Sequence, residues 1–136
     1  MFTLRQQHQS AFQTKAEADF VREVMNYLRE NHADTFVKLP NGEFKVVDLP
    51  EKTLQKMVEG GIAKARNYEI ERRQHLISFI VIMFVSAPNF DEHSKVSSIL
   101  NLNNQTPAVK FESLWIEISD EHWEEVGKKY DSSQWI

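Results

Sequence analysis

The feature that most constrains the fold is a run of ten residues, Leu76 to Val85, in which Ser78 is the single polar residue. An element that is apolar on every side must be buried on every side, so this run predicts the centre of a core. Its β-branched residues also suit a buried strand, and periodicity does not separate the two. The whole element, over 72–87, is longer than the usual strand of about 4–8 residues, which favours a helix that Pro88 ends.

The segments around this element have the three- and four-residue spacing of apolar residues that is typical of amphipathic helices. We expect further helices over 4–31, from Pro50 to about Tyr68, over 94–102, from Pro107 after a Thr106 cap, and from Ser119 as a cap. Proline suits the first helical position because the amide hydrogen it lacks would be unpaired there. Gly60 and Gly61 fall inside the second helix and predict either a kink or a close helix crossing.

Turn-forming residues interrupt the helical pattern between 37 and 47. Asn41 and Gly42 suit a tight β-hairpin because both residues can adopt positive φ. An isolated hairpin is marginally stable in water, so a short β-hairpin near 37–47 and an ordered loop are equal alternatives.

The chain is therefore predicted to be one mainly α domain over 1–136, a bundle of about five to six helices around the buried central helix (72–87). Its 136 residues are enough to hold a core without disulfides or a metal. The tail from Asp131 to Ile136 is expected to be mobile.

Charge and cysteine content limit the function classes. The 16 basic and 20 acidic residues give a net charge of −4, whereas a general nucleic-acid binder needs a basic field. The lack of cysteine removes thiolate nucleophiles, disulfides and cysteine-based zinc sites. The first ten residues have no apolar core of a secretory signal, and the longest apolar run is too short for a membrane span of roughly 20 residues. We expect a cytoplasmic protein.

No motif in the sequence carries catalytic or metal chemistry. The five histidines have no metal-ligand spacing, and there is neither a Gly-x-Ser-x-Gly elbow nor a phosphate-binding glycine loop. Asp91, Glu92 and His93 lie together and could bind a metal or act as a base. The interpretation we favour is that Asp91 or Ser94 caps the following helix while the others face water. We therefore expect no enzyme activity, no cofactor, no metal and no small-molecule substrate.

The tryptophans are candidates for contact with a partner, because aromatic residues are enriched in interface hot spots. Trp115 and Trp123 are most simply explained as closing the core of the C-terminal helices. Trp135 is nearly terminal and harder to bury, so an exposed Trp135 is the stronger candidate. The predicted partner-binding residues are Trp135, Trp123, Asp91 and Glu92.

The order of motifs resembles a family of small helical bacterial proteins that has no assigned chemistry. The likeness covers residues 1 to about 100. It is carried by Met1–Arg5, Phe20–Val21, Tyr27–Arg29, Val58–Ile70 and Phe84–Asp91. The chain departs from this pattern at Glu69, where relatives tend to have glycine. It also departs in the Asn41-Gly42 turn, which looks like an insertion.

Genes of this family often lie beside type VI secretion effector, spike and toxin genes. The resemblance therefore implies a non-enzymatic adaptor or chaperone that binds a secreted effector or toxin from the same gene cluster. The alternative is an immunity protein that neutralises a cognate toxin, since an acidic protein complements a basic toxin site. In both cases the expected partner is another protein, with neither nucleic acid nor membrane involved.

Overall fold

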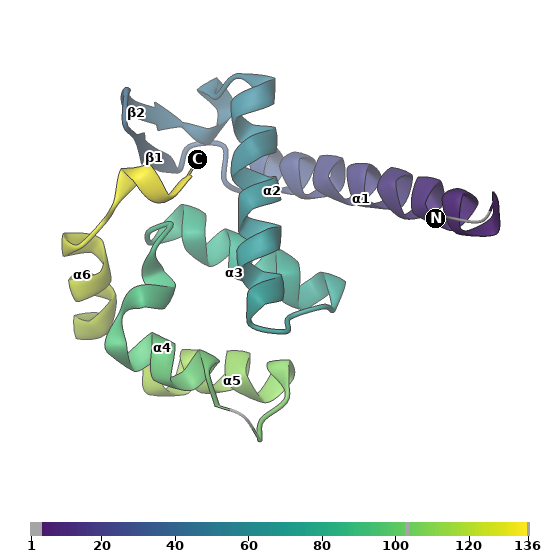
Figure 1. Ribbon diagram of the computed structural model, residues 1–136. Helices are drawn as coiled ribbons and strands as arrows, with labels where there is room; N and C mark the ends of the chain where they lie inside the picture. Colours follow the sequence, from purple (N-terminus) through teal and green to yellow (C-terminus); the bar gives the residue numbers. More distant parts are fainter. Residues whose placement is uncertain (1–3, 103, 136) are drawn as a thin grey trace.

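The computed structural model is mainly helical, which confirms the predicted fold class (Figure 1). It describes the backbone of residues 4–102 and 104–135 and the side chains of residues 15–102 and 104–135. The helices within these residues are α1 (Leu4–Asn31), α2 (Glu51–Asn67), α3 (Arg73–Val85), α4 (Ser94–Leu100), α5 (Pro107–Glu117) and α6 (Asp120–Lys128). The remaining elements are strands β1 (Phe36–Leu39) and β2 (Gly42–Lys45), with 3-10 turns η1 (Val46–Asp48), η2 (Phe90–Glu92) and η3 (Ser132–Trp135). None of the described helices has the length and apolar character needed to cross a membrane.

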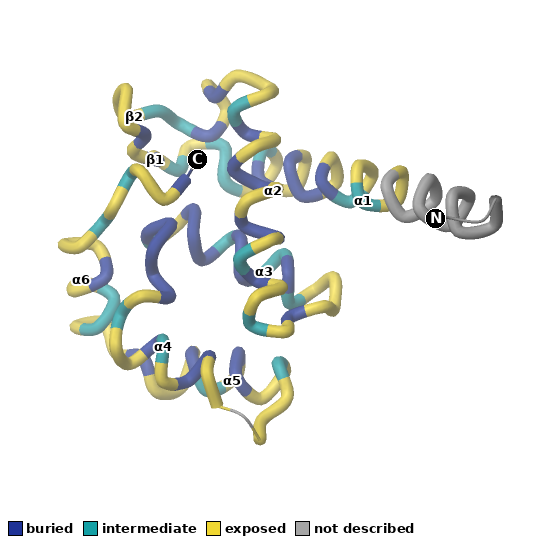
Figure 2. Tube along the Cα trace, viewed as in Figure 1, coloured by how far each residue is buried: buried dark blue, intermediate teal, exposed yellow. Residues whose placement is uncertain are grey.

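The central apolar element is a helix rather than a strand. Phe79 and Ile80 of α3 are fully buried, and α3 contacts α2, α5 and β1. Burial is not complete on every side, however, because Ile77 and Val81 are partly exposed and Val85 is 54% exposed. These three residues are spaced by four and form one stripe, which the neighbouring helices leave uncovered. Figure 2 shows the buried residues gathering where α1, α2, α3 and the hairpin meet.

Gly61 permits α2 to cross α3 closely. A Cβ at this position would lie 3.0 Å from Cγ1 of Ile80 and 3.2 Å from Sδ of Met83. A larger side chain would therefore push the two helices apart, and the glycine is needed for packing rather than for a kink. The neighbouring Gly60 is exposed, and α2 continues through both positions.

Residues 36–45 form the hairpin rather than the loop. The strands are antiparallel, and Leu39 pairs with Gly42 across a two-residue turn. Gly42 has a φ of +146°, as predicted for this turn. Asn41 does not adopt a positive φ, so the prediction was wrong for that residue. The hairpin is not isolated, because Val37 is fully buried and the Lys38 amide donates a hydrogen bond to Oη of Tyr130 over 3.0 Å.

Side-chain caps define the C-terminal helices. Thr106 Oγ1 accepts a hydrogen bond from the amide of Val109, and Ser119 Oγ accepts one from the amide of His122, as predicted. Three predicted helices have shifted boundaries. The central helix α3 runs over Arg73–Val85 rather than 72–87. The second helix starts at Glu51, one residue after Pro50, and α4 stops at Leu100 rather than 102.

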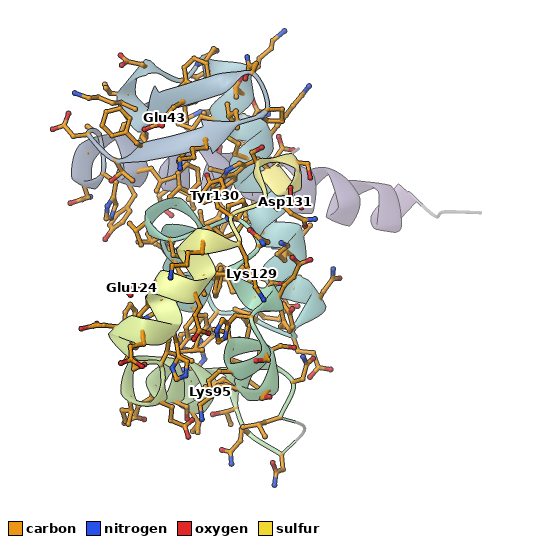
Figure 3. All side chains as sticks on the ribbon, turned by 90° about the vertical axis from the view of Figure 1, so that its left-hand side faces the viewer. Glu43, Lys95, Glu124, Lys129, Tyr130 and Asp131 are labelled. Carbon is orange, nitrogen blue, oxygen red and sulfur yellow. The ribbon has the colours of Figure 1, made fainter. Side chains whose placement is uncertain are left out.

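The C-terminal tail is ordered through residue 135, so the predicted mobility was wrong for the described part, and Ile136 lies outside the described residues. Trp135 is 2% exposed, and its ring lies 4.8 Å from that of Phe84. Its indole N–H donates to Oη of Tyr130 over 2.7 Å. Figure 3 shows Tyr130 and Asp131 where the chain rises from α6 toward the hairpin.

Candidate protein-binding surface

Trp135 was predicted to be an exposed contact for a partner, and this prediction was wrong. The η3 turn folds the last residues back onto α2 and β1, and the indole packs against Phe84. Because the ring is buried and its N–H is already bonded to Tyr130, Trp135 stabilises the fold and is not accessible to another protein.

Asp91 is also buried, with 6% exposure, and it connects η2 to α2. Its Oδ1 lies 3.2 Å from Nζ of Lys64, and its Oδ2 accepts a hydrogen bond of 2.7 Å from the Tyr68 hydroxyl. Nζ of Lys64 also donates to the carbonyl of Pro88 over 2.9 Å. Burial, and then the hydrogen bond to Asp91, raises the pKa of Tyr68 well above its ordinary value. Asp91 therefore faces the protein interior and not a partner.

Neither Asp91 nor Ser94 caps α4, contrary to the prediction. The cap is His93, whose Nδ1 accepts a hydrogen bond of 3.1 Å from the amide of Lys95. Ser94 is the first residue of the helix, where its backbone is already helical. Sequence reasoning missed this cap because histidine is an unusual residue at that position.

Glu92 and Trp123 are the two predicted site residues that retain some accessibility. Glu92 is exposed at a cleft of about 440 Å³ between η2 and α6, where Val126 and Lys129 form part of the opposite wall. Trp123 is partly buried and packs against the core, as its simpler interpretation predicted. The four predicted residues thus separate into two buried side chains, one partly buried side chain and one exposed carboxylate.

Two histidines and a glutamate join α4 to α6. His93 Nε2 lies 2.7 Å from Oε2 of Glu125, and the rings of His93 and His122 are 5.5 Å apart. Nδ1 of His122 accepts a hydrogen bond of 3.1 Å from the Ser119 amide, so both imidazoles serve as helix caps. The hydrogen bond to His93 is the main cause that lowers the pKa of Glu125. Among the described residues no group of three or more such side chains is placed to hold a metal.

The surface that sequence reasoning missed is the outward side of α5. Ile116 is 75% exposed and Trp115 is 64% exposed, the highest values for large apolar residues in the described chain. Trp115 was predicted to close the core, but Phe111 and Leu114 provide the buried contacts of α5 instead. Val109 is also exposed and lies two turns before Ile116, on the same side of the helix.

A signal for this surface was present in the sequence. Phe111, Leu114 and Ile118 are spaced by three and four and form one apolar stripe. Val109 and Ile116 are spaced by seven and fall on the opposite side of the helix, so α5 is apolar on two faces. A helix at the edge of a small protein buries one such face and leaves the other to solvent.

Exposed carboxylates that form no ion pair with the described residues occur along α5 and at the start of α6. The exposed acidic residues from α5 into the start of α6 are Glu112, Glu117, Asp120 and Glu121. Within the described residues, no basic side chain forms an ion pair with any of them. Lys110 does not offset them, because it is buried and donates to the carbonyl of Leu100 over 2.9 Å. We call Val109, Glu112, Trp115 and Ile116 the α5 outer face.

Comparison of the chain with protein-family models, curated proteins and solved structures gave no match. The family resemblance described above therefore stays a prediction. The site has to be interpreted from its own chemistry, which combines adjacent exposed apolar side chains with acidic groups and is suited to protein contact.

Proposed function

We propose that this protein is a non-enzymatic accessory that binds another protein through the α5 outer face. The observation that carries the proposal is the pair Trp115 and Ile116, adjacent in sequence and mostly exposed. Apolar surface gains roughly 25 cal/mol for each Å² removed from water, so a partner that covers both side chains gains substantial affinity. Tryptophan is among the residues most often found at interface hot spots.

The resemblance to proteins from type VI secretion clusters supports a specific partner class. We propose that the partner is a secreted effector or toxin from the same gene cluster and that this chain is its adaptor or chaperone. An adaptor of this kind needs a rigid scaffold and a contact surface rather than a reactive centre. The apolar core supplies the scaffold, and the α5 outer face supplies the contact surface.

An immunity protein is the second candidate, and the acidic character of the α5 outer face favours it. A toxin that acts on nucleic acid needs a basic site, and an acidic surface would compete for that site by electrostatic complementarity. The two candidates differ in one measurable property. Co-expression with the cluster's toxin restores growth if the chain is an immunity protein and has no effect on toxicity if it is an adaptor.

The test of protein binding uses the full chain with an affinity tag, co-expressed with each effector or toxin of its gene cluster. We expect one of them to co-purify with the wild-type chain and the double variant Trp115→Ser/Ile116→Ser to lose at least about 2 kcal/mol, or roughly 30-fold, in affinity. The matched control is Phe36→Ser/Val47→Ser, which removes two other exposed apolar side chains and should bind like wild type.

Two outcomes would contradict the proposal. One is that the wild-type chain binds none of the effectors and toxins in its cluster. The other is that the α5 variant and the Phe36/Val47 control bind with equal affinity, which would place the contact elsewhere.

A further inference from the structure

The charge of this protein is unevenly distributed along the chain. Residues 1–109 carry 13 basic and 13 acidic side chains, whereas residues 110–136 carry three basic and seven acidic ones. The whole net charge of −4 therefore comes from α5, α6 and the tail. The region with the excess negative charge also contains the two most exposed large apolar side chains of the described chain.

Helical geometry places a carboxylate inside the apolar surface. Glu112 precedes Trp115 by three residues and Ile116 by four, so its Cβ lies about 5–6 Å from theirs on the same face. A group that covers the two apolar side chains also covers Glu112 and removes water from it. Burying a carboxylate is unfavourable unless a cation pairs with it, so the occupant of this face must supply a positive charge.

This requirement argues against a second copy of the same chain. A two-fold symmetric contact brings the same patch of both copies together and would set the Glu112 carboxylate of one copy near that of the other. Like charges facing each other across an interface oppose association. Nucleic acid and anionic lipid headgroups carry the same sign as the α5 outer face and are disfavoured for the same reason.

We infer that the α5 outer face binds a basic segment of a different protein, in which an arginine pairs with Glu112 beside a large apolar side chain that covers Trp115 and Ile116. This inference rests on the proposed function and specifies the chemistry of the partner. Arginine fits better than lysine because its planar guanidinium both pairs with a carboxylate and stacks on an aromatic ring. Glu112 and Trp115 are neighbours on the helix and offer both contacts to one guanidinium.

The test measures association and dissociation rates of three short amphipathic peptides with the full chain. The peptides share one apolar face of leucines and differ in the polar face, which is arginine, lysine or glutamate. We expect the affinity order arginine, then lysine, with no binding of the glutamate peptide. Raising the salt from about 0.1 M to 1 M shortens the Debye length from about 10 Å to 3 Å, so association should slow steeply.

Two variants with the same change in net charge test whether the carboxylates of α5, rather than the net charge of the protein, control association with the arginine peptide. Glu112→Lys/Glu117→Lys reverses two exposed charges of α5, one of them on the α5 outer face, and Glu30→Lys/Glu59→Lys reverses two exposed charges on α1 and α2. We expect the first variant to lower the association rate for the arginine peptide by about tenfold or more and the second to change it far less. Trp115→Ser should instead raise the dissociation rate and should remove the preference for arginine over lysine.

The outcomes separate this inference from the proposed function. Equal rates for the two charge variants would overturn the basic partner, as would tight binding of the glutamate peptide. Sedimentation of the wild-type chain as a dimer that Trp115→Ser dissociates would show that the occupant is a second copy, and would overturn it too. If the cluster's effector binds wild type but not Trp115→Ser/Ile116→Ser, and binds Glu112→Lys/Glu117→Lys normally, the proposed function stands and the inference fails.

Discussion

The region built from α1, α2 and α3 and the region built from α5 and α6 use their charges in opposite ways. In the first region three acidic residues pair across helices: Glu17 with Arg66 at 2.7 Å, Glu51 with Arg29 at 2.5 Å, and Glu23 with Arg73. In the second region only Glu125 has such a partner among the described residues, which is His93. Carboxylates of the first region thus join its helices, whereas most of those in the second have no ion-pair partner in the described part of the chain and remain available to another molecule.

The same two regions differ in how they use aromatic side chains. Phe79 of α3 is fully buried and contacts the rings of Tyr68 and Phe90, at centroid distances of 6.1 and 5.0 Å. Trp115 of α5 is 64% exposed. The difference shows that the first region supplies stability, while the second supplies accessible surface at little cost to the fold.

The largest expected effect compares the two aromatic residues directly. Phe79→Ala should lower the free energy of unfolding by about 3–5 kcal/mol, because it opens a cavity in a closely packed core. Trp115→Ala should change it by less than about 0.5 kcal/mol, as exposed substitutions usually do. Chemical denaturation of both variants measures the difference. A loss of several kcal/mol for Trp115→Ala would show that α5 packs through this residue.

The next effect compares two carboxylates. Asp91→Ala should cost about 2–4 kcal/mol, because it removes the acceptor of the Tyr68 hydroxyl and leaves the Lys64 ammonium partly buried without its counter-charge, bonded only to the Pro88 carbonyl. Glu112→Ala should be close to neutral, since Glu112 is exposed and has no ion pair with the described residues. Urea midpoints of the two variants at neutral pH test this contrast. Equal midpoints would mean that the Asp91 contacts contribute nothing to stability.

The smallest effect concerns His75, which joins the two regions by stacking on Phe111 at 5.4 Å. Burial, and then the charge of Arg72, lowers the pKa of His75 below its ordinary value of 6.5. The folded protein thus binds this proton less tightly than the unfolded chain does. The contribution of neutral His75 to the free energy of unfolding is complete above pH 6.5. It is lost as the pH falls through the lower pKa that His75 has in the folded state.

The variant His75→Phe keeps a ring against Phe111 and removes the titration. Urea unfolding at about pH 7.5 and pH 5.5 should show a smaller acid loss of stability in His75→Phe than in wild type. Other histidines continue to titrate in both proteins, so the comparison isolates His75. An unchanged acid loss would show that its protonation is not coupled to folding.

Local signals in the sequence predicted most of the fold. These signals depend on residues close together in the chain. They are the caps at Thr106 and Ser119, the apolar run of α3 and the bounds of α1. The candidate site was predicted poorly because it depends on which helix face meets the core. The residue type is the same at Trp115 and Trp135 and does not show which side chain is buried. Trp115 is exposed because α5 packs through another face, and Trp135 is buried because η3 returns to Phe84.

Glu69, where the predicted resemblance leads us to expect glycine, has a backbone conformation that favours glycine. Glu69 has a φ of +63°. The Glu69 amide donates a hydrogen bond to the carbonyl of Arg66 over 2.9 Å, and the Ile70 amide donates one to the carbonyl of Ala65 over 3.2 Å. This is the helix end at which glycine is usual, because glycine adopts positive φ without a steric penalty. The predicted resemblance marked this position in the sequence, but the positive φ that makes glycine favourable there is known only from the structure.

The burial of Trp135 also has a spectroscopic consequence. Its indole is enclosed beside Phe84 and hydrogen-bonded to Tyr130, so it should emit at shorter wavelength than Trp115 and resist quenching by iodide. Trp115 faces water and should be readily quenched. Of the three tryptophans, Trp135 should therefore report loss of the native structure, and Trp115 should report when the α5 outer face becomes covered.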